Sequence, residues 1–222
     1  MLFRSHLDWL LVTKRIGNVR QMIPDRWSVC MPPNLWLGIT VVNQAEADRD
    51  IPKLLGLKVS VRFLSMEPLL GPVNLRHLNE DRETNEVDCL HPWTWEQEID
   101  AWRDTDDEWE DQFKDYHGVA VSDASGPMHA SVDWVIVGGE SGPGARPCNV
   151  ERIRDVVKQC AAAKVPCFVK QLGANPHTFC ESTSEVTVDL RLRQLRLKHP
   201  KGGDPAEWPE DLRVRQFPEV VR

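Results

Sequence analysis

The chain contains five short apolar runs, and each of them ends in a cluster of polar residues. A strand that is buried on both faces has a continuous apolar sequence of this kind, as in a parallel sheet covered by helices. We therefore expect five parallel strands, which the apolar runs place at residues 7–13, 35–39, 61–64, 132–137 and 165–169.

Helical segments follow three of these runs. Residues 16–22 fit a short helix and residues 44–55 fit a longer one, which Asn43 can cap. The clearest helix spans residues 150–163, where apolar side chains recur on one face and Asn149 can act as the cap. Alternation of strands and helices favours right-handed βαβ units, so the pattern predicts an α/β fold with a parallel sheet.

The polar clusters carry functional information, because the loops after the carboxyl ends of parallel strands meet at one edge of a sheet. Three charged residues at this edge are candidate catalytic groups: Glu67, Glu140 and Lys170. The two carboxylates fit an acid/base pair or the ligands of a hard metal ion. They fit structural ion pairs with nearby arginines equally well. Lys170 fits an anion contact, or a Schiff base if it is desolvated.

A glycine-rich segment, GGESG at residues 138–142, follows the fourth run and is the strongest local motif. Glycines at this position let backbone N–H groups approach a ligand, although a tight structural turn uses the same residues. Arg146, a few residues later, can pair with a carboxylate or a phosphate. The candidate ligand-binding residues at this edge are Lys14, Arg15, Thr40, Asn43, Gly138, Gly139, Ser141, Arg146 and Gln171.

Charge is unevenly distributed along the chain. Residues 80–115 hold 15 Asp or Glu and 3 Lys or Arg, a local net charge of −12, whereas the whole chain carries −7. The remainder is therefore net positive at +5, which suits an anionic small molecule or a nucleic acid as a partner. We expect one α/β domain over residues 1–222, with an acidic insert at 74–131 and a basic tail at 181–222.

The insert and the tail each leave two interpretations open. In the insert, apolar side chains recur at helical spacing and form one stripe, which either packs onto the domain or binds a partner. The residues of this stripe are Trp95, Ile99, Trp102, Trp109 and Phe113. In the tail, residues 186–193 alternate between apolar and polar, as in a half-buried strand. The basic residues around that strand either contact nucleic-acid phosphates or face solvent.

The location and the redox state follow from what the sequence contains. No apolar stretch approaches the roughly 20 residues that a membrane span needs, and no secretory signal opens the chain. We therefore expect a cytoplasmic protein without a membrane partner. The scattered spacing of the cysteines favours reduced thiols and argues against a zinc or iron–sulfur site within this chain. The cysteines lie at positions 30, 89, 148, 160, 167 and 180.

Six ordered segments of the chain resemble one family. They are LVTKR at 11–15, NLWLGITVVNQ at 34–44, RFLSMEPLLGP at 62–72, DWVIVGGESGP at 133–143, FVKQLG at 168–173 and KGGDPAEWP at 201–209. Together they resemble a family of phage and bacterial proteins of unknown function. The resemblance covers nearly the whole chain except the acidic insert.

Members of that family are similar to radical S-adenosylmethionine enzymes, so the resemblance implies a barrel of parallel strands, a [4Fe–4S] cluster and S-adenosylmethionine. In full-length relatives the cysteine trio that holds the cluster precedes the first segment found here. We therefore expect a partial TIM-type, radical-SAM-like barrel of about five βα units, the carboxyl-terminal part of a longer enzyme, with no cofactor site of its own. The alternatives are a cluster-independent lyase or hydrolase and a non-catalytic binding protein that uses the acidic insert.

Overall fold

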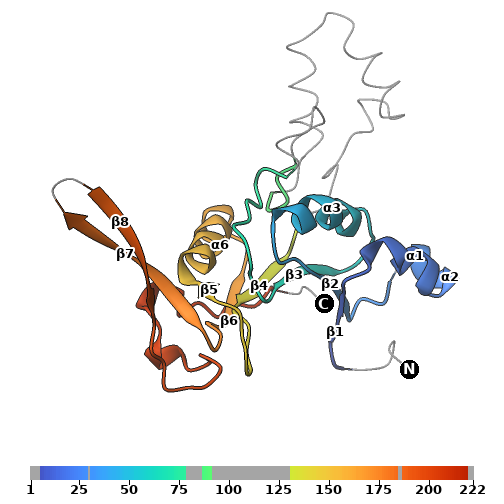
Figure 1. Cartoon of the computed structure of the whole chain (residues 1–222). Helices are drawn as coiled ribbons and strands as arrows, with labels where there is room; N and C mark the ends of the chain where they lie inside the picture. Colours follow the sequence, from blue (N-terminus) through green and yellow to red (C-terminus); the bar gives the residue numbers. More distant parts are fainter. Residues whose placement is uncertain (1–5, 30, 79–86, 92–130, 185–186, 220–222) are drawn as a thin grey trace, which may run out of the picture.

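The five apolar runs form the strands of one parallel sheet, as predicted. The computed structural model describes residues 6–29, 31–78, 87–91, 131–184 and 187–219 (Figure 1). The strands are hydrogen-bonded in the order β1-β2-β3-β4-β6. The order of these five strands across the sheet is therefore the same as their order along the chain. Their bounds are Trp9–Thr13 for β1, Leu35–Thr40 for β2, Val61–Met66 for β3, Trp134–Gly138 for β4 and Cys167–Gln171 for β6.

The predicted barrel is not confirmed, because the sheet is open in the part of the chain that the structure describes. A barrel closes when its first and last strands pair with each other. Here β1 pairs with β2 alone, and the outer edge of β6 is occupied by the carboxyl-terminal segment, which runs antiparallel to it. The backbone N–H of Val169 donates to the carbonyl of Val214 at 2.9 Å, and that of Gln216 donates to Cys167 at 2.9 Å.

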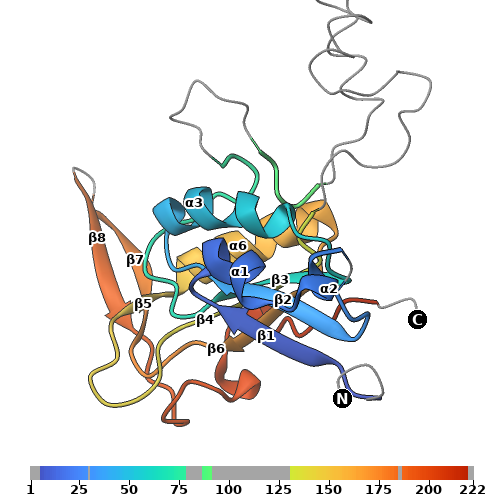
Figure 2. The ribbon, with the colours of Figure 1, turned by 90° about the vertical axis from the view of Figure 1, so that its right-hand side faces the viewer.

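Two long helices cover one face of the sheet (Figure 2). Helix α3 spans Gln44–Leu55 and helix α6 spans Val150–Ala163, which are the predicted bounds. The main core lies between these helices and the side chains that β2, β3, β4 and β6 direct toward them. The first connection contains shorter helices: η2 at Ile16–Asn18, α1 at Val19–Met22 and α2 at Asp25–Val29.

The opposite face of the sheet carries no helix in the described part of the chain (Figure 1), and its buried side chains are mostly aromatic. Trp36, Phe63 and Trp134 are buried there, and the ring centroids of Trp36 and Phe63 lie 6.0 and 5.9 Å from that of Trp134. The Phe63 ring fills the space beside Gly38, where a Cβ atom would lie 2.4 Å from Cε2 of the ring. The absence of a side chain at Gly38 thus allows the large rings to pack against one another.

A second, smaller sheet lies beside the first. It consists of β5 (Cys148–Asn149), β7 (Pro176–Ser184) and β8 (Thr187–Gln194), and β8 corresponds to the strand predicted in the tail. Two short helices follow, η4 at Pro205–Glu207 and η5 at Glu210–Leu212. Trp208 and Leu212 are buried in the main core, so this part of the predicted basic tail packs against the sheet.

The apolar run of β1 is not buried, since the four side chains from Trp9 to Val12 are 42–51% exposed. The predicted apolar stripe of the insert, from Trp95 to Phe113, lies outside the described residues. Of the helices that the structure describes, none combines the length and apolar character required to cross a membrane.

Asn43 and Glu46 cap α3 in a variant of the capping box, in which the Glu46 carboxylate accepts from the residue before the cap. The Asn43 side-chain oxygen accepts from the Glu46 N–H at 3.0 Å, and the Glu46 carboxylate accepts from the Val42 N–H at 3.0 Å. We expect Asn43→Ala to lower the free energy of unfolding by about 1 kcal/mol, measured by urea denaturation, because the first turn loses its acceptor. Asn43→Asp keeps an acceptor and should retain most of the stability. Equal losses in both variants would contradict this role.

Candidate functional site

The carboxyl ends of the parallel strands bring several of the predicted site residues to one edge of the sheet. Thr40 ends β2, Glu67 follows β3, Gly138 ends β4, and Lys170 and Gln171 end β6. Thr40 lies opposite Ser65 in the register of β2 and β3, so two hydroxyl groups also reach this edge.

An ion pair between Glu67 and Lys170 is the central contact of the site. The ammonium Nζ of Lys170 lies 2.8 Å from Oε2 of Glu67, whose side chain is only 14% exposed, whereas that of Lys170 is 57% exposed. The pair joins the ends of β3 and β6, between which β4 lies. Glu67 is therefore held by a lysine, and not by one of the arginines that the sequence also offered.

Gly138 makes room for this ion pair. A Cβ atom at Gly138 would lie 2.8 Å from Oε1 of Glu67 and 2.7 Å from the carbonyl oxygen of Gln171. Both distances are shorter than real Cβ contacts, so the missing side chain is what allows Glu67 to lie over the end of β4.

The second carboxylate oxygen of Glu67 has an unusual environment. Oε1 is buried, and the structure gives it no hydrogen-bond donor among the residues that it describes. A buried polar atom without a partner costs free energy, about 1–3 kcal/mol for a neutral group and more for a charged one. A ligand that supplies an O–H or N–H group would remove that cost once the carboxylate turns this oxygen away from Gly138.

Glu140 lies in the loop after β4 and is held by Arg146. Arg146 donates to this carboxylate from Nε at 2.8 Å, from Nη2 at 3.1 Å and from its backbone N–H at 3.0 Å. These hydrogen bonds favour the ionised form and lower the pKa of Glu140 to about 2. The structure thus shows the ion-pair arrangement for Glu140, one of the alternatives that the sequence left open.

Gly139 and Gln171 fix the backbone at the end of β4. The Gly139 N–H donates to the Gln171 carbonyl at 3.0 Å, and the Gln171 side chain donates to the Gly139 carbonyl at 2.9 Å. A Cβ at Gly139 would lie 2.3 Å from the carbonyl oxygen of Leu172. The backbone N–H and the carbonyl of Gly139 therefore both form hydrogen bonds within the protein, and neither is left to face a ligand in this structure.

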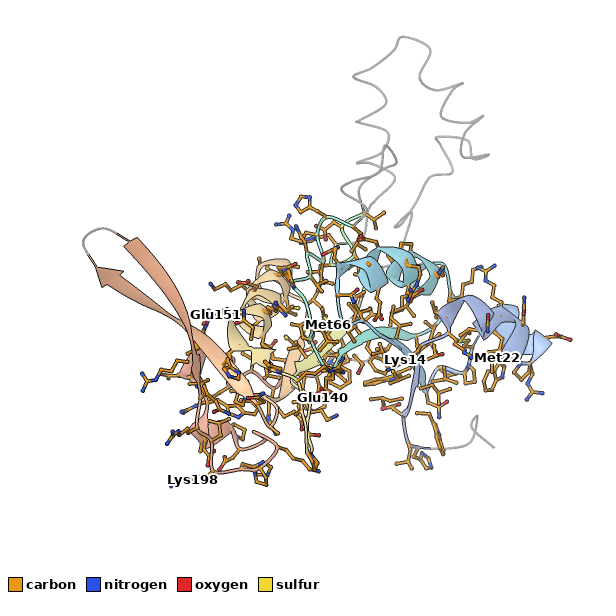
Figure 3. The ribbon with its side chains drawn as sticks, viewed as in Figure 1. Lys14, Met22, Met66, Glu140, Glu151 and Lys198 are labelled. Atoms are coloured by element: carbon orange, nitrogen blue, oxygen red, sulfur yellow. The ribbon has the colours of Figure 1, made fainter. Side chains whose placement is uncertain are left out.

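The remaining predicted residues lie farther from the ion pair. Lys14 and Arg15 are exposed after β1, four strand spacings from β6, which is about 19 Å along a flat sheet (Figure 3). Ser141 is exposed in the same loop as Glu140. Asn43 caps α3 with its side-chain oxygen. The sheet therefore brings Glu67, Lys170 and Gly138 together and leaves the charges of β1 apart.

Arg215 contacts the backbone of Lys170, although the sequence analysis assigned it only to the predicted basic tail at residues 181–222. Its guanidinium carbon lies 5.2 Å from the ring centroid of Phe168 and 5.4 Å from that of Trp208, and Nη2 donates to the Lys170 carbonyl at 3.4 Å. The sequence contained no signal for this position, because it depends on the pairing of the carboxyl-terminal segment with β6.

The described residues do not fit a metal or iron–sulfur site. They contain no group of three or more His, Cys, Asp or Glu side chains placed to hold a metal ion. Cys89, Cys148, Cys160 and Cys167 are buried and free. Burial raises the pKa of the Cys148 thiol to about 11 and that of Cys89 further, which disfavours the thiolate that binds metals.

Two hollows of the described surface lie away from the ion pair. One, of about 800 Å³, is lined by residues that precede β4 and β6, including Asp133 and Val165, and so lies at the amino edge of the sheet. The other, of about 450 Å³, lies between α6 and the loop after β3, beside Arg76 and Lys158.

Replacing Gly138 tests whether close packing at the end of β4 is required. We expect Gly138→Ala to lower the free energy of unfolding by about 1–3 kcal/mol, because the new methyl overlaps both Glu67 and the backbone of β6. Gly17→Ala is the matched control, since a Cβ there has no neighbour within 4 Å, and it should change stability by less than about 0.5 kcal/mol. Unchanged stability in Gly138→Ala would contradict the packing described above.

The ion pair of Glu140 predicts a titration at low pH. Because the folded pKa of about 2 lies below the ordinary value of 4.5, the pair stabilises the fold above pH 4.5 and this contribution is lost as the pH falls toward 2. Carbon-13 NMR of the Glu140 carboxylate should give this pKa directly. In Arg146→Gln it should rise toward 4.5, and a value near 4.5 already in the unaltered chain would show that the pair does not form.

Comparison with known proteins agrees with part of the resemblance found in the sequence. Residues 1–199 match the model of a family described as "Protein of unknown function (DUF5131)". No curated protein and no solved structure matches the chain. The expected relation to a family of unknown function is confirmed, whereas the phage origin and the radical-enzyme relation stay predictions. The chain belongs to the DUF5131 family of proteins of unknown function.

Proposed function

We propose that the chain binds the substrate of an enzymatic reaction, and that Glu67 exchanges a proton with this substrate while Lys170 helps to bind it. The observation that carries this proposal is the environment of Glu67. One of its carboxylate oxygens pairs with Lys170 at 2.8 Å, and the other is buried without a donor among the described residues.

The chemistry of the pair defines the substrate class. Oε1 of Glu67 is an acceptor that no described donor uses, so we infer that the substrate contributes a hydroxyl or amine group at that atom, whose proton Glu67 can remove. The ammonium group of Lys170 has three donors, of which one goes to Glu67, and its side chain is exposed enough to meet a second acceptor. Together these groups suit an anionic substrate in which a carboxylate or phosphate lies near a hydroxyl or amine.

Further charges at the carboxyl edge support an anionic substrate. Arg215 lies beside Lys170 through its contact with the Lys170 carbonyl, and Lys14 and Arg15 follow β1 at the same edge. Outside residues 80–115 the chain carries a net charge of +5. Positive charge around the site raises the local concentration of an anion.

The proposal also includes a more specific statement, that the chain is related to radical S-adenosylmethionine enzymes. It is supported by the resemblance of the six segments and by the consecutive order of the parallel strands, with both long helices on one face. Because the described residues do not fit a [4Fe–4S] cluster, we assign no step to that group. The proton exchange at Glu67 does not depend on it.

A ligand screen on matched variants tests the proposal. We would screen hydroxy acids, amino acids and phosphorylated alcohols by saturation-transfer NMR against the unaltered chain, Glu67→Gln and Lys170→Met. A ligand of the site should bind at least about tenfold more weakly to both variants, because each loses one charge-assisted contact. Lys58→Met removes an exposed lysine that precedes β3, at the opposite edge of the sheet, and should leave binding unchanged.

Two results would refute this function. One is a screen in which no compound of these classes binds. The other is a ligand whose affinity is the same in Glu67→Gln, Lys170→Met and the unaltered chain. Circular dichroism of each variant would exclude loss of the fold as the reason for weaker binding.

A further inference from the structure

Strand β1 presents an apolar surface that the described part of the chain does not cover. The exposed fractions of Trp9, Leu10, Leu11 and Val12 are 42, 45, 44 and 51%. Successive side chains of a strand point to opposite faces, so β1 is exposed on both faces of the sheet. The neighbouring β2, with a similar apolar sequence, is buried on both faces from Leu35 to Ile39.

Among the described residues, the backbone of β1 has no strand paired with it on its outer side. It is the edge strand of the five-stranded sheet, and its ladder partners within the described residues all belong to β2. Natural proteins protect such edges with charges, proline or bulges, and an apolar edge without them is a site for pairing with another strand. Residues 9–13, WLLVT, contain neither charge nor proline.

We propose that β1 pairs antiparallel with β1 of a second copy of this chain, about a two-fold axis at Leu11. In this register Leu11 faces its own copy, Leu10 faces Val12 and Trp9 faces Thr13. Residues directly opposite each other share a face of the sheet, so the helices of both copies lie on the same side and the aromatic faces become continuous. This proposal is independent of the proposed enzymatic function.

Charge complementarity at the ends of the strand selects the second copy as the partner and fixes the register. Asp8 precedes β1 and Lys14 follows it. In the pairing about Leu11, Asp8 of each copy lies opposite Lys14 of the other, which places opposite charges across both ends of the ladder. A shift by one residue places Lys14 opposite Trp9 or Leu7 and loses both charge pairs.

The size of the contact predicts its strength. Only the five residues of β1 and their immediate neighbours take part, so the interface is small, and we expect a dissociation constant of about micromolar order. Sedimentation velocity of the full chain between about 1 and 100 µM should therefore show a monomer that converts to a dimer. A chain that stays monomeric throughout would overturn the proposal.

Charge reversal tests the register. Asp8→Lys and Lys14→Asp each place like charges opposite one another and should weaken the dimer about tenfold or more. The double variant Asp8→Lys/Lys14→Asp restores opposite charges and should recover dimerisation. A double variant as weak as the single ones would reject this register.

Cross-linking gives a second measurement that does not depend on the charges. Antiparallel pairing about Leu11 brings the two Leu11 Cα atoms to about 4.5–5.5 Å, within the range that a disulfide spans. Leu11→Cys should therefore form a cross-linked dimer on mild oxidation. Val12→Cys is the control, because it faces Leu10 and not its own copy, and it should cross-link no more than the unaltered chain. Equal cross-linking of the two variants would overturn the proposal.

Discussion

The missing side chains of Gly138 and Gly139 are the constraint on which the site depends. At these positions the end of β4 approaches β6 so closely that a Cβ atom would lie 2.7 Å or less from a carbonyl oxygen of residues 171 or 172. This approach lets Glu67 and Lys170 meet across β4, although their strands are not neighbours. The buried oxygen of Glu67 is a consequence, since the carboxylate lies over backbone and not in solvent.

The two faces of the sheet differ in a way that explains where the chemistry lies. One face forms the main core with α3 and α6, and its side chains are buried there. The other face is aromatic around Trp134 and ends at the carboxyl edge in Ser65 and Lys170, which continue the alternation of Phe63 and Phe168. The Glu67 side chain is 14% exposed and that of Lys170 is 57% exposed, so the ion pair lies at the boundary between this face and solvent.

Much of the fold could be predicted from the sequence because its signals are local. The cap at Asn149 and the recurring apolar side chains between Val150 and Cys160 define α6, and the observed bounds agree with them. Barrel closure was not predictable in this way, because it depends on which strands pair at the edges. The pairing of Gln216 with Cys167 joins residues that are 49 positions apart, and no periodicity signals it.

The exposure of β1 shows a further limit of the sequence pattern. An apolar run of four residues predicts that something covers both faces, but it does not say which molecule provides the cover. For β2 the cover comes from its own chain, through α3 on one face and the Trp134 ring on the other.

For the site, the pattern located Glu67 and Lys170 at the correct edge because strand ends are local features. It left open whether Glu67 pairs with a lysine or an arginine, since side-chain partners depend on the order of strands across the sheet. That order also separates Lys14 and Arg15 from Lys170 by three intervening strands. Any ligand that contacts both groups of charges must therefore extend along the edge of the sheet, whereas a small one is confined to Glu67, Lys170 and Arg215.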